Sequence, residues 1–211
     1  MKSVLKISAW LIAFLIVLFF SFRIEKLDEH QLKSAKTTFD AVKFVQNFWE
    51  NDLPVSIEEA TPVSEIFSLF DSNLELAFEK FGKKLGISKT RYFMAKGSGI
   101  ITLVSDEYLL VQLPNSQEIK IATDFIFGNA IREGSGKVNI NDFVNMTDFN
   151  NVSVAINKLA KEKVVARLKK NAVAGQQIEF AGAFELSEEN TAFENVLLIP
   201  VSAKLSDGKS E

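Results

Sequence analysis

The hydrophobic residues recur with a helical period up to about residue 90 and with a strand period after it. The segment FDAVKFVQNFWENDLP carries apolar residues three and four positions apart, which predicts a helix capped by Asp40 and stopped by Pro54. The segment TPVSEIFSLFDSNLELAFEKFG carries one continuous apolar stripe. It predicts a single helix with Thr61 as its cap and Pro62 at its first position.

From residue 91 onward, alternating segments predict five strands and one helix. The strands are RYFMAKGSGIITLVS, EYLLVQLP, EIKIATDFIFG, QQIEFAGAFEL and NVLLIPVSAKL, and Gly97 and Gly99 predict a bulge or bend in the first. The helix, NVSVAINKLAKEKVVARLKKN, follows the third strand with Asn150 or Asn151 as its cap. This element order is that of an OB-fold, so we expect a mainly β (α+β) protein with an OB-like five-stranded barrel.

The N-terminal segment predicts attachment to a membrane. Residues 7–22, ISAWLIAFLIVLFFSF, carry no charge and are flanked by Lys6 and Arg23. As a helix this run would be about 24 Å long, and the flanking basic side chains would reach the headgroups. A cleaved signal peptide is the alternative, but bulky phenylalanines occupy the positions where a cut site needs small residues. We therefore expect an uncleaved transmembrane anchor, single-pass in the inner (cytoplasmic) membrane, with the C-terminal domain in the periplasm or outside.

These patterns divide the chain into five parts. The segment RIEKLDEHQLKSAKTT is charged and poor in apolar residues, which is typical of a stalk. The helices before the barrel form an addition that we expect to pack outside it or across one end. The predicted parts are an anchor over 1–23, a charged stalk over 24–38, a helical addition over 39–90, the barrel over 91–205 and a flexible tail over 206–211.

Composition argues against several function classes. The formal charge of −3 disfavours a nucleic-acid partner, which would need a basic surface. The chain has no cysteine, and its single histidine, His30, lies in the charged stalk. No GxSxG, P-loop, HExxH or EF-hand spacing occurs. We therefore predict no catalytic residue, no metal and no cofactor, and a protein that is not an enzyme.

The stretch between the third strand and the helix, ATDFIFGNAIREGSGKVNINDFVNMTDFNN, is rich in amides and carboxylates. One interpretation is structural, because Asn and Asp form turns and cap helices, and Arg132 would then pair with Asp142 or Asp148. The other is a polar pocket for a sugar or nucleoside, with an aromatic platform beside amides. The candidate ligand-binding residues are Trp49, Asn129, Arg132, Asn141, Asp142, Asn150 and Asn157.

The combination of IFGNAIRE, NINDFVNMTDFNNVSVAINK, IEFAGAFEL and LLIPVSAKL resembles an uncharacterised bacterial family of predicted periplasmic lipoproteins. The chain departs from the family pattern because it has no lipobox cysteine and carries an apolar helix in its place. The resemblance implies an OB-like barrel and no established activity. It also implies an association with ribose-type sugar ABC transporters, whose permease or sugar-binding protein would be the partner.

Two functions stay open from the sequence. One is a non-enzymatic envelope protein that assists or docks with an ABC-type sugar importer. The other is a small-ligand binding domain with its pocket around Arg132. A solvent-connected polar cavity at Arg132 would favour ligand binding, whereas an exposed apolar patch on the helices added to the barrel would favour docking.

Overall fold

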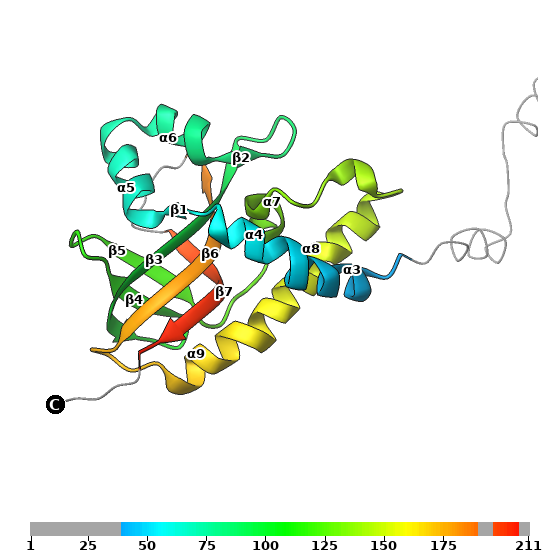
Figure 1. Ribbon diagram of the computed structural model, residues 1–211. Helices are drawn as coiled ribbons and strands as arrows, with labels where there is room; N and C mark the ends of the chain where they lie inside the picture. The colour runs from blue at the N-terminus through cyan, green and yellow to red at the C-terminus, as the bar shows by residue number, and fades with distance from the viewer. Residues whose placement is uncertain (1–38, 190–195, 207–211) are drawn as a thin grey trace, which may run out of the picture. The chain divides into compact units, whose positions relative to one another are not determined.

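The computed structural model describes residues 39–189 and 196–206. The predicted anchor and stalk lie outside the described residues, as does the tail from residue 207 onward. Within the described part, no helix is both long enough and apolar enough to cross a membrane. The described residues from Asp40 onward belong to a single compact unit (Figure 1).

Five strands close into a barrel. They are β3 (Thr90–Val104), β4 (Tyr108–Gln112), β5 (Glu118–Ala122), β6 (Gln177–Ser187) and β7 (Leu197–Leu205). Neighbouring strands follow the order β3-β4-β5-β7-β6, and the long antiparallel pairing of β3 with β6 closes the ring. All pairings in the ring are antiparallel except that of β5 with β7, which is parallel. The predicted five-stranded barrel is therefore confirmed.

The first barrel strand pairs with different neighbours along its length. Its N-terminal half pairs with two short strands, β1 (Thr61–Pro62) and β2 (Lys83–Lys84), and its C-terminal half pairs with β4. At Gly99 a Cβ would lie 2.3 Å from the Gln112 carbonyl oxygen, so only glycine permits this approach of β4. The register of this pairing shifts between Ile101 and Leu103, a bulge just after the two glycines.

The first helical segment continues past Pro54. It comprises α3 (Ala41–Asn47), the π-helical turn η2 (Phe48–Asp52) and α4 (Leu53–Glu58). Asp40 caps it as predicted, because its carboxylate accepts a bond from the Lys43 amide. The prediction that Pro54 stops the helix is wrong, because Pro54 lies in the first turn of α4, directly after the π-turn. A proline there does not remove a hydrogen bond from the interior of α4.

The second helical segment is two helices, which corrects the prediction of one. They are α5 (Val63–Ser72) and α6 (Leu74–Phe81). The chain is extended at Asn73, whose side chain accepts a bond from the Leu76 amide and caps α6. Thr61 and Pro62 form β1 instead of starting the helix, because both pair with β3. The apolar stripe gave no sign of the break, since both helices turn their apolar faces to one core.

The polar stretch folds into α7 (Ala130–Ser135), one 3-10 turn η3 (Ile140–Asp142) and the start of α8 (Met146–Ala160). The segment NINDF makes a single short turn, η3. The predicted cap at Asn150 or Asn151 is wrong, because Asn145 caps α8 by accepting a bond from the Asp148 amide. The helix continues through a π-turn, η4 (Lys161–Val165), into α9 (Ala166–Asn171).

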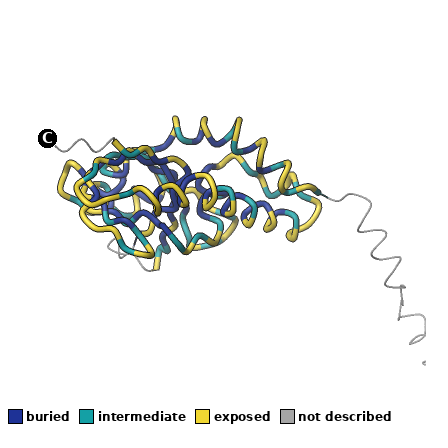
Figure 2. Tube along the Cα trace, turned by 90° about the horizontal axis from the view of Figure 1, so that it is seen from below, coloured by how far each residue is buried: buried dark blue, intermediate teal, exposed yellow. Residues whose placement is uncertain are grey.

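The helices before the barrel share its hydrophobic core. Phe93 and Phe184 stack inside with ring centroids 4.8 Å apart, and Phe70 meets Phe93 edge-on at 5.5 Å. Val164 and Leu168 of the long C-terminal helix belong to the same cluster. Figure 2 shows the buried residues gathered on the inner sides of the elements. The helical addition is therefore part of one packed body with the barrel.

Candidate functional site

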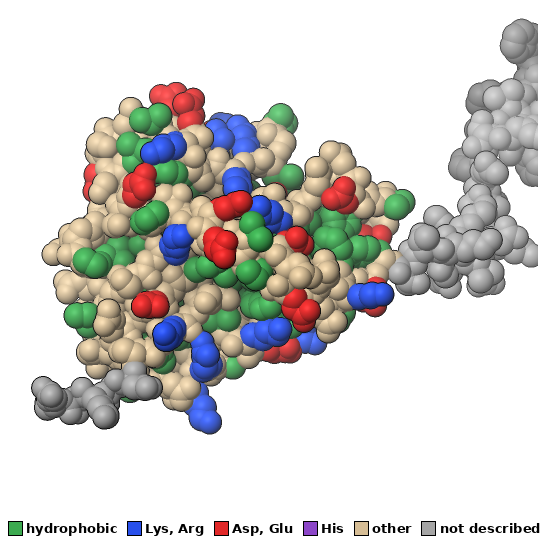
Figure 3. All heavy atoms as spheres, viewed as in Figure 1, with side chains coloured by type: hydrophobic (Ala, Val, Ile, Leu, Met, Phe, Trp, Pro, Cys, Tyr) green, Lys and Arg blue, Asp and Glu red, His purple; other side chains and the backbone are tan. Residues whose placement is uncertain are grey.

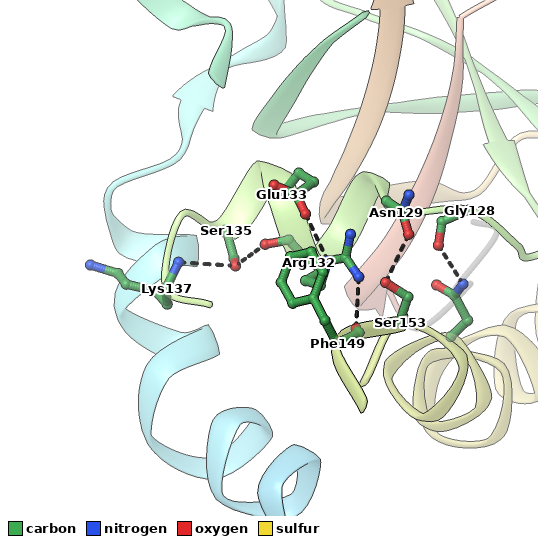
Figure 4. Close-up of polar contacts among 9 residues, drawn as sticks. Gly128, Asn129, Arg132, Glu133, Ser135, Lys137, Phe149 and Ser153 are labelled. Carbon is green, nitrogen blue, oxygen red and sulfur yellow. Dashed lines mark hydrogen bonds and ion pairs between the residues drawn. The ribbon is translucent and has the colours of Figure 1, made fainter. Parts of the chain in front are cut away.

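Arg132 is a fully buried cation at the centre of the polar stretch. Its side chain is 1% exposed. Its Nε donates to the Glu133 carboxylate at 2.7 Å, and a terminal nitrogen donates to the Phe149 carbonyl oxygen at 2.7 Å. The guanidinium carbon lies 3.5 Å from the centroid of the Phe149 ring. Figure 4 shows the guanidinium between α7 and the start of α8. These contacts join the two helices.

A second set of bonds joins the β5–α7 loop to α8. The Ser153 hydroxyl donates to the Asn129 side-chain oxygen at 2.9 Å, and the Asn157 amide donates to the Gly128 carbonyl oxygen at 3.0 Å (Figure 4). Ser153 and Asn157 are both buried. Each bond ties one loop residue to α8, so the loop has a defined position on the helix.

Tyr92 and Glu185 add two titratable groups beside this set. They are cross-strand neighbours on β3 and β6. Burial raises the pKa of the Tyr92 hydroxyl, with the Glu185 and Glu133 carboxylates adding to the rise, whereas Arg132 and a hydrogen bond with Asn129 oppose it. Partial shielding from water raises the pKa of the Glu185 carboxyl as well. The Tyr92 hydroxyl is therefore an uncharged group on the barrel side of the Arg132 cluster.

The C-terminal end of α7 is also bonded. Lys83 of β2 donates to the carbonyl oxygens of Gly134 and Ser135 at 2.8 and 2.9 Å, which satisfies groups that a helix end leaves open. Burial lowers the pKa of Lys83, and the nearby ammonium of Lys137 lowers it further. Gly134 packs directly on the barrel, because a Cβ there would lie 3.2 Å from that of Ala183. The short helix is thus held at both ends.

The structure brings together only part of the predicted site. Asn129, Arg132 and Asn157 lie in the bonded cluster. Trp49 lies on η2 with the Lys163 ammonium 5.7 Å from its ring centroid. The remaining candidates, Asn141, Asp142 and Asn150, are exposed on η3 and α8.

The predicted carboxylate partner of Arg132 is wrong. Its ion pair is with the adjacent Glu133, whereas Asp148 accepts a bond from Asn145 within the cap of α8. Spacing in the sequence could not identify the partner, because Glu133 is next to Arg132 in the chain and faces it only through the local geometry of α7. Within the described residues, no buried side-chain nitrogen or oxygen lacks a hydrogen-bond partner. The pocket around Arg132 stays a prediction.

Two exposed phenylalanines on the β5–α7 loop were missed from the sequence. The segment was expected to continue a strand, but β5 ends at Ala122. Phe125 and Phe127 are 62% and 75% exposed, and Val154 on α8, next to Ser153, is 68% exposed. We call Phe125 and Phe127, on the loop that is bonded to α8, the loop–helix apolar surface. Single exposed apolar residues are common, but two rings on a loop bonded to a helix are not explained by the core.

Two hollows lie away from the Arg132 cluster. One of about 510 Å³ lies against the outer faces of β4 and β5, lined by Tyr108, Leu110 and Lys120 among others. The other, of about 960 Å³, lies where β3, β4, the β4–β5 turn and the α9–β6 loop meet. Both are open to solvent at the surface. Neither is lined by a residue of the predicted site.

The surface charges of the described part are mixed. On the face in Figure 3, basic and acidic side chains are interspersed. Lys137 pairs with Glu59 at 2.9 Å, and Arg91 pairs with Glu188 at 2.6 Å. Each bond holds the pKa of the carboxyl below its ordinary value. Among the residues that the structure describes, no group of three or more His, Cys, Asp or Glu is placed to hold a metal ion.

The closed barrel with parallel β5 and β7, and with its helix between the third and fourth strands, defines an OB-fold protein. The chain belongs to the family described as predicted periplasmic lipoprotein (DUF2291), whose sequence profile matches residues 12–204. The resemblance seen in the sequence is therefore confirmed. Membership indicates a membrane-associated location in the cell envelope.

A solved structure agrees with the fold. The crystal structure of an OB-fold protein from Thermotoga maritima matches with a TM-score of 0.72 and 27% sequence identity. The match covers 81% of this chain and 100% of the other. None of the curated proteins matches the chain.

Proposed function

We propose that this protein is a non-catalytic, membrane-tethered envelope protein that docks with a component of an ABC-type sugar importer, its permease or its sugar-binding protein. The observation that supports docking is the loop–helix apolar surface. Phe125 and Phe127 are more than half exposed, and the residues that follow them are bonded to α8. A loop held in this way loses little conformational freedom when a partner covers it.

The arrangement of Arg132 supports docking over a pocket at that place. Its side chain is buried, and its bonds go to Glu133 and Phe149. A ligand would have to displace these bonds to reach the guanidinium, and each buried charge left unpaired is costly. Aromatic side chains are enriched in the centres of protein interfaces, which suits Phe125 and Phe127.

Site-specific photo-crosslinking in the native membrane tests the docking surface. A photoreactive phenylalanine analogue at position 127 is expected to capture an integral permease or a sugar-binding protein of an ABC importer. The same analogue at Ile87, which is 100% exposed on the β2–β3 turn, serves as the control and is expected to capture neither. Adding Phe125→Ser should weaken capture at 127. Absence of transporter components from the products at 127 would contradict the proposed function.

The mode of tethering is part of this proposal. The chain has no cysteine to carry a lipid, so we propose that the apolar run at residues 7–22 anchors it as a single-pass helix. The full chain should stay in the membrane pellet after a carbonate wash and should keep Met1. Recovery of a soluble form beginning near Arg23 would show cleavage and end the anchor proposal.

A further inference from the structure

The larger hollow has a floor built from three neighbouring strands. Ile100 of β3 is directly opposite Gln112 of β4 on one side and Gln177 of β6 on the other. Side chains so paired have Cβ atoms about 4.5–5.5 Å apart. The adjacent residues Ile101 and Ile178 are fully buried in the barrel, so alternation along the strands turns the three side chains outward. The floor is thus an aliphatic side chain between two primary amides.

The walls of this hollow are loops fixed by their own bonds. On one side, the Gly175 amide donates to the Ile101 carbonyl oxygen at 2.7 Å. The Gln176 side chain accepts from the Val173 amide and donates to the Ser206 carbonyl oxygen. On the other side the β4–β5 turn closes through a bond from the Ser116 amide to Leu113. The hollow, about 960 Å³, is therefore formed before any ligand arrives.

The two floor glutamines have unused hydrogen-bonding groups. Within the described residues, the side chains of Gln112 and Gln177 make no hydrogen bond, unlike the neighbouring Gln176. A primary amide supplies two donors and an acceptor without charge. The described residues that line the hollow include no Asp, Glu, Lys or Arg. A charged ligand would give up hydration here without gaining a counter-charge from these described residues.

We propose that this hollow binds an uncharged polyhydroxylated molecule, with hydroxyl groups bonded to Gln112 and Gln177 and a C–H face on Ile100. The volume lies within the range of about 300–1,000 Å³ that is typical of small-molecule sites. The ligand is either a free monosaccharide or a neutral sugar unit at the end of a glycan, which present the same chemistry. The site shares no residue with the loop–helix apolar surface. The proposal of a ligand site and the proposed function can therefore be tested separately.

Titration of the isotope-labelled full chain in micelles tests the site, because the amide signals of glutamine side chains are directly visible by NMR. The probes are glucose, maltotriose, and gluconate as a charged molecule of similar size to glucose. Saturable shifts of the Gln112 and Gln177 side-chain signals are expected with glucose or maltotriose and not with gluconate. A response to glucose alone would assign the ligand to a free sugar, and a response to maltotriose alone would assign it to a glycan end. A response to both would show that one sugar unit is sufficient for binding.

Matched variants make the outcome decisive. The double variant Gln112→Met and Gln177→Met keeps the side-chain length and removes the amides. Its binding, followed by the backbone amide signal of Ile100, should be weaker by at least about tenfold. Gln46→Met, at an exposed position on α3, should bind as the wild type does. Absence of saturable shifts with both neutral probes, equal binding of gluconate, or unchanged affinity in the double variant would each overturn the proposal.

Discussion

At the scale of single residues, Arg132 shows how a buried charge is accommodated. Its guanidinium has a carboxylate, a backbone carbonyl and an aromatic ring around it, contributed by Glu133 and Phe149. The Glu133 side chain is itself only 9% exposed. Neither charge could be removed without leaving the other in a poorly solvated position.

Replacing Arg132 by alanine should lower the free energy of unfolding by about 3–5 kcal/mol, because the Glu133 carboxylate is stranded and the helix contacts are lost. Urea unfolding of the full chain in micelles measures the change. Lys158→Ala is the control, since its pair with Glu162 is 3.9 Å long and exposed, and its loss should cost less than about 1 kcal/mol. Equal effects in the two variants would show that Arg132 has no structural role.

Glu185 makes a pH-dependent contribution of known sign. Its carboxyl has a raised pKa because part of the side chain is shielded from water. The folded protein thus binds this proton more readily than the unfolded chain does. The contribution to stability is fully present below the ordinary value of 4.5 and is lost as the pH rises through the raised pKa.

Glu185→Gln should therefore raise the melting temperature relative to wild type at neutral pH and leave little difference at a pH below 4.5. Thermal melts at the two pH values give the comparison. Glu179→Gln, on the same strand, is the control. If Glu185→Gln raised the melting temperature more at acidic pH than at neutral pH, the result would contradict a raised pKa for this carboxyl.

At the scale of elements, the polar stretch is a connection that is hydrogen-bonded to its neighbouring elements at several points. Lys83 bonds the end of α7, Arg132 joins α7 to α8, and Asn157 bonds the loop that precedes α7. Two of its amides act as caps, as the structural interpretation expected: Asn139 caps η3 and Asn145 caps α8. The cap of α8 is Asn145, whose side chain both accepts from and donates to Asp148.

Asn145→Ala should destabilise the protein by about 1 kcal/mol, the usual cost of losing an N-cap. Asn150→Ala should be neutral or slightly stabilising, because Asn150 is exposed inside α8 and alanine is the better helix former. Chemical unfolding of both variants distinguishes the two positions. A larger loss in Asn150→Ala than in Asn145→Ala would place the start of the helix later in the chain.

At the scale of the whole molecule, the barrel and the helices before it form one core. Phe67, Phe70 and Phe78 of α5 and α6 pack against Phe93 and Phe184 of the barrel. Phenylalanine suits this junction because it brings a large apolar area without a polar group that would need a partner. The stability of the barrel thus depends on the preceding helices, whose residues are far away in the sequence.

Closure of the barrel should be sensitive to Gly99. A Cβ at this position would lie 2.3 Å from a backbone oxygen of β4, and a backbone atom in a sheet cannot move aside cheaply. Gly99→Ala should cost at least about 2 kcal/mol in unfolding free energy. Ser98→Ala, one residue earlier, should stay within about 0.5 kcal/mol of wild type. A Gly99→Ala protein as stable as Ser98→Ala would show that the strands part easily at this point.

Local patterns in the sequence were enough to predict the element order of the barrel and the Asp40 cap, because alternation, helical periodicity and capping are properties that a short window contains. The family was identified separately, by its resemblance to known motifs. The same local patterns wrongly predicted one helix where there are two. The break lies at Asn73, and the apolar stripe of the sequence continues across it.

Features that depend on contacts between distant residues emerged only from the folded chain. Glu133 and Phe149 surround Arg132, and Phe125 and Phe127 stay outside the core. Gln112 and Gln177 lie on either side of Ile100, on strands that are far apart in the chain. The physical reason is that burial and pairing of a side chain depend on which residues contact it in the folded protein. The closure of the barrel decides those contacts, and no short stretch of sequence contains them.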